Sequence, residues 1–220
     1  MNNAEAYLQC RCGKCRITLC DPHMRYRLEC LCCDCRQRGL ISAAKHPNNA
    51  LPDEILEYKR GIDDCYFANA FLVDDESRAL LRFSKLREDA YNTTAMSACC
   101  GTLMCGVHPV YEGASVSVNA DSCRITTPYE IENCVVLFGC DFPPAEYATV
   151  QARANVPMLY SVYDEGDNET MKEFLRIVTE PLADQYKLDG FTTFERLCAE
   201  TTFEIDNSFF AESRTRQPAR

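Results

Sequence analysis

The sequence predicts a mainly β protein that binds metal through its cysteines and ends in a helical extension. Three observations lead to this prediction. Sixteen of the 220 residues are cysteines, and ten of them lie in three short clusters. Strand-like alternation of apolar and polar residues dominates up to about residue 150. Helical periodicity becomes clear only from about residue 168.

The first 62 residues hold two cysteine clusters and the segment 16–29 between them. The pieces ITL and MRYRL of this segment alternate as half-buried strands do, and Asp21-Pro22-His23 between them predicts a turn. The small residues of LISAAK, at 40–45, are compatible with a helix, and a loop follows them.

The middle of the chain contains further strand-like segments. Residues 66–73 and 78–86 are rich in apolar residues and flank the acidic stretch DDES, a pattern that predicts a β-hairpin with DDES as its turn. Another strand is expected in ASVSVNA, at 114–120. CRITT and NCVVLFG then predict a further strand pair.

The character of the sequence changes after Pro143-Pro144. Asn168 is a plausible N-cap for a helix whose apolar residues recur at helical spacing: Met171, Phe174, Leu175 and Val178. A second helix is expected near FTTFERLCAE, after Gly190. We therefore predict a β-rich zinc domain at 1–150 and a helical C-terminal extension at 151–220.

The overall charge is acidic, with a formal net charge of −10 and a pI near 4.9. This sign argues against nucleic acid as a partner, because that affinity depends on cations that neutralise phosphates. Basic residues near the first two clusters suit either a small anion or the compensation of thiolate charge: Arg11, Lys14, Arg16, Arg25, Arg27, Arg36 and Arg38. We expect no membrane partner and a cytoplasmic location, because no long apolar run and no secretory signal is evident.

The spacing of the clustered cysteines predicts zinc. The clusters are Cys10-Arg-Cys12-Gly-Lys-Cys15, Cys30-Leu-Cys32-Cys33-Asp-Cys35 and Cys99-Cys100-Gly-Thr with Cys105. In a reducing compartment, closely spaced cysteines are more often metal ligands or catalytic thiols than disulfides. Thiolates two or three residues apart on a turn supply several corners of a zinc tetrahedron. Six isolated cysteines are expected to be small core residues: Cys20, Cys65, Cys123, Cys134, Cys140 and Cys198.

The order C-x-C-G, then C-x-C-x-x-C-R, then C-G-T resembles the glutathione-dependent formaldehyde-activating enzyme family. That family shares its domain with centromere protein V and has an Mss4-like β-tent fold. The resemblance covers about residues 8–120, including LLRFSKLR before the third cluster. It implies an Mss4-like fold here and two zinc ions, one structural and one catalytic.

The structural zinc implied by the resemblance is bound by Cys10, Cys12 and Cys100. Ser97 stands where the family pattern has another cysteine, and a neutral hydroxyl is a poor zinc ligand beside thiolates. The fourth ligand must then be Cys99, Cys105 or Cys15, or the fourth position stays weakly bound. We favour Cys99, which is already tethered at the site.

The catalytic zinc implied by the resemblance is bound by Cys30, Cys32 and Cys35. Three protein ligands leave a position for substrate or water. Arg36 is the candidate to bind a substrate carboxylate, and the alternative is that it packs over its own loop. Cys33 is the alternative fourth ligand that would close the site.

The resemblance implies a zinc-dependent carbon–sulfur lyase, similar to S-(hydroxymethyl)glutathione synthase, that acts on a small thiol such as glutathione and an aldehyde such as formaldehyde. The alternative is a non-enzymatic, zinc-stabilised β module for protein interaction, like centromere protein V. His46 and His108 are candidate proton shuttles, or ordinary loop histidines.

Overall fold

In a computed structural model of the chain, residues 6–161, 168–201 and 203–205 are described here. Thirteen strands in these residues form two sheets, so the prediction of a mainly β protein with short helices is confirmed. The smaller sheet has the order β10-β1-β2-β5, and all its pairs are antiparallel. Its strands are β1 Tyr7–Gln9, β2 Arg16–Leu19, β5 Phe71–Leu72 and β10 Arg124–Thr126.

The larger sheet has the order β12-β11-β3-β4-β9-β8-β7-β6-β13. Its centre is antiparallel, while short parallel strands extend both edges. Its strands are β3 Tyr26–Cys30, β4 Ile62–Ala68, β6 Leu81–Lys85, β7 Thr93–Ser97, β8 Leu103–Val107, β9 Ser115–Asn119, β11 Val136–Leu137, β12 Met158–Leu159 and β13 Phe203–Ile205.

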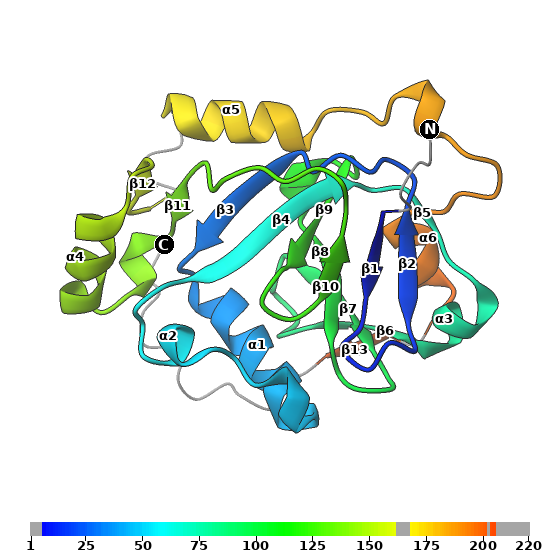
Figure 1. The fold of residues 1–220 in the computed structure, drawn as a ribbon, viewed down its shortest axis with the longest axis horizontal. Coiled ribbons are helices and arrows are strands. Elements are labelled where there is room, and N and C mark those ends of the chain that lie inside the picture. Colours follow the sequence, from blue (N-terminus) through cyan, green and yellow to red (C-terminus); the bar gives the residue numbers. More distant parts are fainter. Residues whose placement is uncertain (1–5, 162–167, 202, 206–220) are drawn as a thin grey trace.

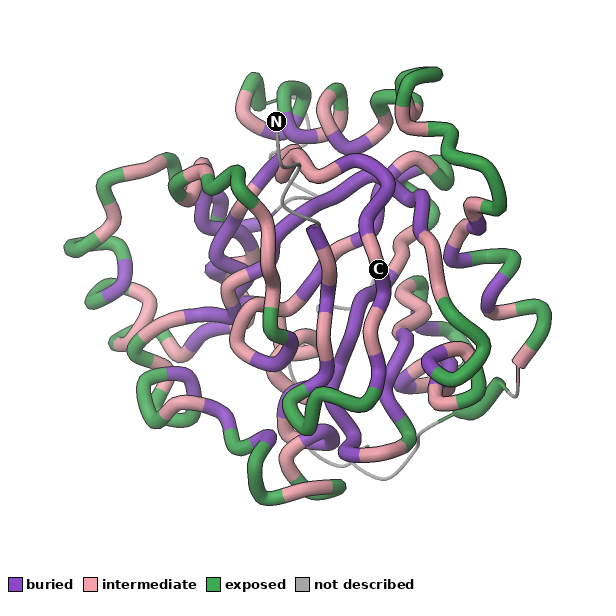
Figure 2. The backbone as a smooth tube through the Cα atoms, turned by 45° about the vertical axis from the view of Figure 1, so that its right-hand side comes forward, coloured by how far each residue is buried: buried purple, intermediate pink, exposed green. Residues whose placement is uncertain are grey.

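The largest core cluster contains side chains from both sheets. Leu8 and Ile17 of the small sheet belong to the same buried cluster as Phe67, Phe83 and Met104 of the large one. Figure 1 shows β1 and β2 standing in front of the large sheet, and in Figure 2 buried residues run along the strands of both. Burial of this apolar surface is the main force that holds the two sheets together.

The described residues contain six α-helices: α1 Cys33–Lys45, α2 Asp53–Leu56, α3 Asp75–Leu80, α4 Pro144–Arg153, α5 Glu169–Val178 and α6 Phe194–Ala199. Helix α1 extends beyond the predicted segment 40–45 and begins inside the second cysteine cluster. Asn168 caps α5 as predicted, because its side chain accepts a hydrogen bond from Thr170 N.

The predicted hairpin between residues 66 and 86 is wrong. Asp74 accepts a hydrogen bond from Ser77 N and caps the short helix α3, so DDES starts a helix instead of a β-turn. Strand β4 pairs with β3 and β9, whereas β6 pairs with β7 and β13. The first run is divided between β4 of the large sheet and β5 of the small one, and neither strand pairs with β6.

The predicted strand pair near residues 123–139 is also corrected. Both strands form, but β10 pairs with β1 of the small sheet, while β11 pairs with β3 and β12 of the large one. Strand register here is decided by partners distant in the sequence, which local alternation cannot specify.

The described elements after residue 151 pack into the rest of the molecule. Strands β12 and β13 extend the large sheet at its two ends. Phe174 of α5 lies edge-on to Tyr26 and Tyr66, with ring centroids 5.2 Å apart in both cases. Phe194 of α6 lies edge-on to Phe83 at 5.0 Å. The division at residue 150 stays a prediction, but side chains beyond it belong to both major core clusters.

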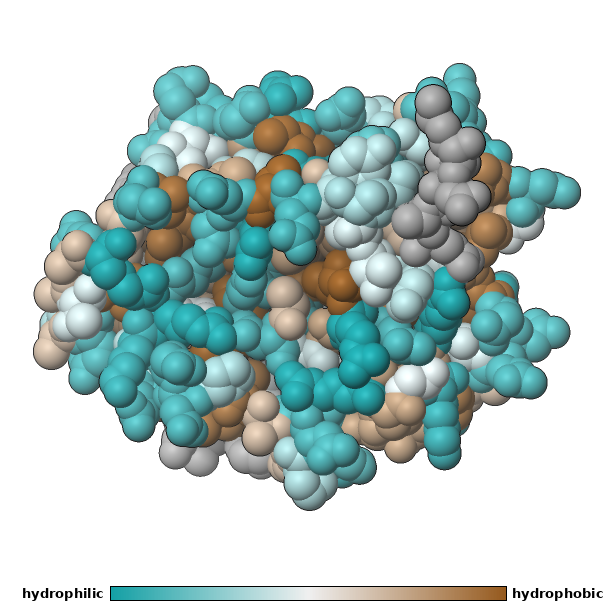
Figure 3. Space-filling view, viewed as in Figure 1, coloured by the Kyte–Doolittle hydropathy of each residue, from teal (hydrophilic) through white to brown (hydrophobic). Residues whose placement is uncertain are grey.

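The surface is mostly polar. The face in Figure 3 is largely hydrophilic, with small, separated apolar areas. No helix among the described residues has the length and apolar character needed to cross a bilayer.

Candidate metal centres

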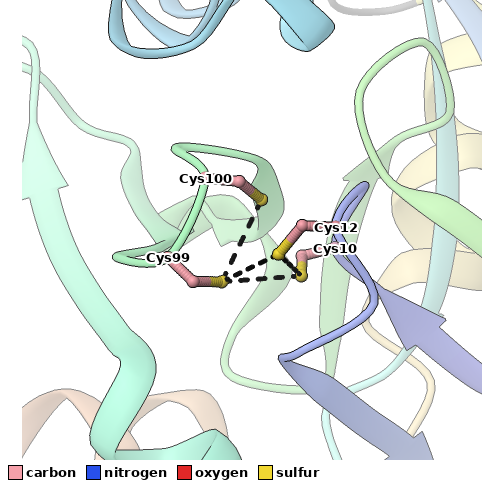
Figure 4. A group of neighbouring side chains, drawn as sticks. All are labelled: Cys10, Cys12, Cys99 and Cys100. Carbon is pink, nitrogen blue, oxygen red and sulfur yellow. Dashed lines mark hydrogen bonds between the residues drawn. The ribbon is translucent and has the colours of Figure 1, made fainter.

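The first cysteine group joins the two sheets. Cys10 and Cys12 lie in the turn between β1 and β2, whereas Cys99 and Cys100 lie in the turn between β7 and β8. The four sulfurs point toward one another (Figure 4). Cys10 Sγ is 3.5 Å from Cys12 Sγ and 3.7 Å from Cys99 Sγ, and Cys99 Sγ lies 3.4 Å from Cys12 Sγ and 4.0 Å from Cys100 Sγ.

These separations fit a tetrahedral ion. Zinc lies about 2.3 Å from each thiolate sulfur, which places the sulfurs of a regular tetrahedron about 3.8 Å apart. Four of the six sulfur–sulfur separations lie between 3.4 and 4.0 Å and bracket that value, and all six are within 4.8 Å. The buried Cys10 and Cys100 form the inner side of the group, and the exposed Cys12 its outer side. The first cysteine group can therefore hold a metal ion with little rearrangement.

Glycine completes both turns. Gly13 has φ +81° and Gly101 has φ +66°, a region that favours glycine. A Cβ on Gly101 would also lie 2.7 Å from Lys45 Cβ of α1. Each glycine amide donates back to the start of its turn, Gly13 N to Cys10 O at 3.0 Å and Gly101 N to Ser97 O at 2.7 Å.

Ser97 occupies in the second turn the place that Cys10 occupies in the first. Cys10 N donates to Cys15 O, and Ser97 N donates to Thr102 O, five residues ahead in both cases. Both turns also have a hydrogen bond from their last residue to the side chain of their first. Cys15 N donates to Cys10 Sγ at 3.2 Å, and Thr102 N donates to Ser97 Oγ at 3.1 Å. The serine thus preserves the turn without a thiolate, and Cys99 supplies the extra sulfur.

Helix α1 supports the second turn directly. Ser42 of α1 donates to Gly101 O at 2.6 Å, and Asn49, just beyond the helix, donates to Cys100 O at 2.6 Å. The opposite end of α1 carries two cysteines of the second group, so one helix positions both groups.

The electrostatics of the first group favour one thiolate in the absence of a cation. Burial works against the ionised form of Cys100, but hydrogen bonds from Ser97 and Thr102 outweigh it and lower the pKa of Cys100 to about 5. Partial loss of hydration raises the pKa of the Cys12 thiol, and burial raises the pKa of Cys99. Four neighbouring thiolates repel one another, so full ionisation requires a cation.

The second cysteine group consists of Cys30, Cys32 and Cys35. Cys30 ends β3, Cys32 is the N-cap of α1, and Cys35 lies in its first turn. Cys35 N donates to Cys32 Sγ at 3.3 Å, and Cys30 Sγ lies 3.5 Å from Cys35 Sγ. The three sulfurs lie within 4.8 Å of one another, as ligands of one ion must. The positive end of the helix dipole favours thiolates here.

Cys35 is the cysteine of the second group whose ionised form is favoured. Hydrogen bonds from the thiols of Cys30 and Cys32 hold the pKa of Cys35 well below its usual range. The pKa values of Cys30 and Cys32 are raised instead, because hydrogen bonds with the neighbouring thiols and loss of hydration disfavour their ionised forms. The three thiols thus behave as a coupled set that a divalent cation would ionise together.

Three other clustered cysteines lie outside both groups. Cys33 N donates to Asp141 Oδ2 at 2.8 Å, and burial with nearby carboxylates raises the pKa of the Cys33 thiol to about 12. The Cys15 thiol donates to Ser77 O at 3.6 Å, and Cys105 is buried in β8. Of the three candidates for a fourth ligand of the first group, the structure brings Cys99 to it.

Two charged side chains that the sequence did not single out as site residues contact Cys35. Arg38 Nη1 of α1 lies 3.8 Å from Cys35 Sγ, and the Cys35 thiol lies at the same distance from Asp64 Oδ2 of β4. Both residues are 8% exposed. Burial raises the pKa of Asp64 well above its usual range. The sequence signal for Asp64 was the Asp63-Asp64 pair within an apolar strand, where alternation turns one carboxylate inward.

Arg36 makes contacts away from the sulfurs. Its guanidinium donates to Ile55 O at 3.4 Å and Leu56 O at 3.0 Å, and it stacks 4.1 Å above the ring centroid of Tyr58. These contacts hold the α2 turn against α1. The predicted role of Arg36 in substrate binding stays a prediction.

The candidate basic patch and the two histidines have local partners. Arg11 donates to the carbonyls of Asn48, Asp121 and Ser122, and Arg27 pairs with Asp63 at 2.6 Å. His46 and His108 each precede a proline, and each Nδ1 accepts from the amide two residues ahead, at 3.1 Å. The Arg11 and histidine contacts stabilise loops, whereas the Arg27–Asp63 pair joins the neighbouring strands β3 and β4.

Comparisons with known proteins give no information about the function of the two cysteine groups. No protein-family model, curated protein or solved structure matches the chain. The chemistry must therefore be argued from the two cysteine groups.

Proposed function

We propose that the chain binds two zinc ions, and that the second is the centre of a carbon–sulfur lyase acting on a small thiol and an aldehyde. The observation that carries this proposal is the difference between the groups. Four sulfurs meet in the first and three in the second. Four thiolates complete a structural site, whereas three protein ligands are typical of catalytic zinc.

The proposed reaction is reversible addition of a thiol to an aldehyde. The thiol sulfur forms a bond to the carbonyl carbon and the carbonyl oxygen takes the thiol proton; the reverse reaction breaks the same bond. Zinc, when bound, would stabilise the substrate sulfur as a thiolate at neutral pH. No oxidant or reductant is needed. The product with glutathione and formaldehyde would be S-hydroxymethylglutathione.

The residues of the second cysteine group would hold the zinc and set its charge. Cys30, Cys32 and Cys35 as thiolates leave the zinc site with one negative charge, which the buried Arg38 offsets from 3.8 Å. A substrate carboxylate would pair with Arg36 once its contacts with the α2 turn are released, or with Arg38. Replacement of each arginine separately tests which one takes part.

The decisive experiment measures thiol binding to the cobalt-loaded protein. Thiolate-to-Co²⁺ charge-transfer bands are expected to change when glutathione is added, and Cys32→Ser is expected to abolish the change. Serine is a good N-cap, so this substitution preserves the start of α1. Arg36→Ala is expected to weaken glutathione binding while the metal stays bound.

The alternative is a zinc-stabilised β module without catalytic activity. It would be favoured if the wild-type bands already report a full set of ligands and do not respond to excess glutathione. Absence of carbon–sulfur bond formation with several small thiols and aldehydes would support the same conclusion.

A further inference from the structure

Asp64 lies on the same side of the large sheet as the second cysteine group. In the antiparallel pairing of β3 with β4, Leu28 is opposite Asp64 and Cys30 is opposite Ile62. Residues opposite each other, and residues two apart along a strand, point to the same side. The strand register therefore sends the Asp64 carboxylate toward Cys30, and the packing of α1 places Cys35 against it.

The environment of Asp64 is unusual for a carboxylate. The residue is 8% exposed, and among the described residues the one hydrogen-bond partner of its side chain is Cys35 Sγ, at 3.8 Å, while the charge of the buried Arg38 also acts on the carboxylate. Its neighbour Asp63 instead pairs with Arg27 at 2.6 Å. Burying a carboxylate is costly unless a cation or several donors compensate, and buried charges in proteins are paired or coordinate metals.

We propose that Asp64 is the fourth protein ligand of the second cysteine group. This inference rests on the proposed binding of zinc there. Zinc accepts carboxylate oxygen beside thiolate sulfur. Asp64 Oδ2 touches Cys35 but lies outside the set of atoms within 4.8 Å of one another, so its side chain moves inward when it binds the ion.

A carboxylate ligand would make the second centre different in kind from the first. Thiolate is the softer ligand and suits zinc better beside other thiolates. A substrate thiol can therefore replace Asp64, whereas it cannot readily replace a cysteine of the first group. The exchange leaves the charge of the first coordination sphere unchanged, since one anion replaces another. Arg38, 3.8 Å from Cys35 Sγ, is the nearby cation for the released carboxylate.

Cadmium NMR of the full-length protein tests this ligand directly. Each centre gives its own resonance, and its position depends on the number of sulfur ligands. Asp64→Asn is expected to shift or abolish one resonance and to weaken metal binding at that centre more than about 10-fold, the lower end of the loss for an outer-shell partner. Asp64→Cys is expected to move the same resonance toward that of the first group. Asp63→Asn is the matched control and should leave both resonances in place.

The resonance of the first group shows in every sample whether the protein has folded. Wild-type resonances in both Asp64→Asn and Asp64→Cys would overturn the proposal. Glutathione titration of the same samples separates it from the proposed function. If glutathione binds but the Asp64 substitutions leave both cadmium resonances unchanged, only the ligand assignment is wrong. If the Asp64 substitutions change a resonance but glutathione does not bind, only the lyase proposal is wrong.

Discussion

Ser97 Oγ accepts the amide of Thr102 in the same way that Cys10 Sγ accepts the amide of Cys15. The two turns thus share their hydrogen-bond framework, although one begins with a thiol and the other with a hydroxyl. This relationship explains how a serine is accommodated beside four cysteines. Ser97 is fully buried, so its hydroxyl has to be satisfied inside the turn.

The first prediction separates the roles of Ser97 and Cys99. Cys99→Ser is expected to weaken zinc binding in the first group, because one of the four thiolates that complete a structural site is lost. Ser97→Ala should keep the ion but lose about 1–3 kcal/mol of stability, since the buried Thr102 amide loses its acceptor. Zinc content and urea unfolding measure both effects. The double variant with Ser97→Cys and Cys99→Ser should regain zinc binding at the first group. If it does not, position 97 does not face the ion.

The second prediction concerns the first group as a link between the sheets. Cys12→Ala is expected to lower zinc content by one ion per chain and to lower Tm by about 10 °C, because each kcal/mol lost shifts Tm by roughly 2–4 °C in a chain of this size. Cys134→Ala is the control, since Cys134 lies outside both groups. Unchanged zinc content and Tm in Cys12→Ala would contradict the assignment.

The third prediction concerns Cys33, the sequence alternative for closing the second centre. Its side chain lies near Asp34 and Asp141 and is not part of the group. Cys33→Ser should therefore leave zinc stoichiometry and glutathione affinity unchanged. A loss of one zinc ion, measured by atomic absorption, would make Cys33 a ligand after all.

The fourth prediction is a pH dependence of the metal-free protein. The pKa of Cys100 is about 5 in the folded chain, against about 8.5 for an unfolded cysteine. Its contribution to stability is thus fully present above pH ~8.5 and is lost as pH falls toward 5. The difference in urea midpoint between wild type and Cys100→Ser should therefore shrink progressively on acidification. A difference in urea midpoint that grows toward low pH would contradict the predicted direction of the pH dependence.

The fifth prediction concerns the C-terminal segment. Phe174 is 4% exposed and packs against Tyr26 and Tyr66, in the core cluster that contains Cys30. Phe174→Ala should cost about 3–5 kcal/mol in the free energy of unfolding. Lys172→Ala, on the exposed side of the same helix, should cost less than about 0.5 kcal/mol. Equal effects of the two changes would show that α5 does not contribute to the core.

Local patterns in the sequence were enough to predict several elements. The Asn168 cap and the recurrence of Met171, Phe174 and Val178 predicted α5, because capping and helical periodicity act over a few residues. The alternation in ASVSVNA predicted β9 for the same reason. Strand partners were not predictable, since β4 and β6 look like a hairpin locally but pair elsewhere.

Cysteine spacing alone determined that Cys10 with Cys12, and Cys30 with Cys32 and Cys35, could chelate, because each set is tethered within a few residues. Tertiary structure alone decided which distant groups join them. It brings Cys99 to within 3.7 Å of Cys10 across 89 positions, sets Asp64 against Cys35, and ties Arg36 to the α2 turn. The physical reason is that these contacts depend on sheet register and helix packing, which are set by burial of the whole core and not by neighbouring residues.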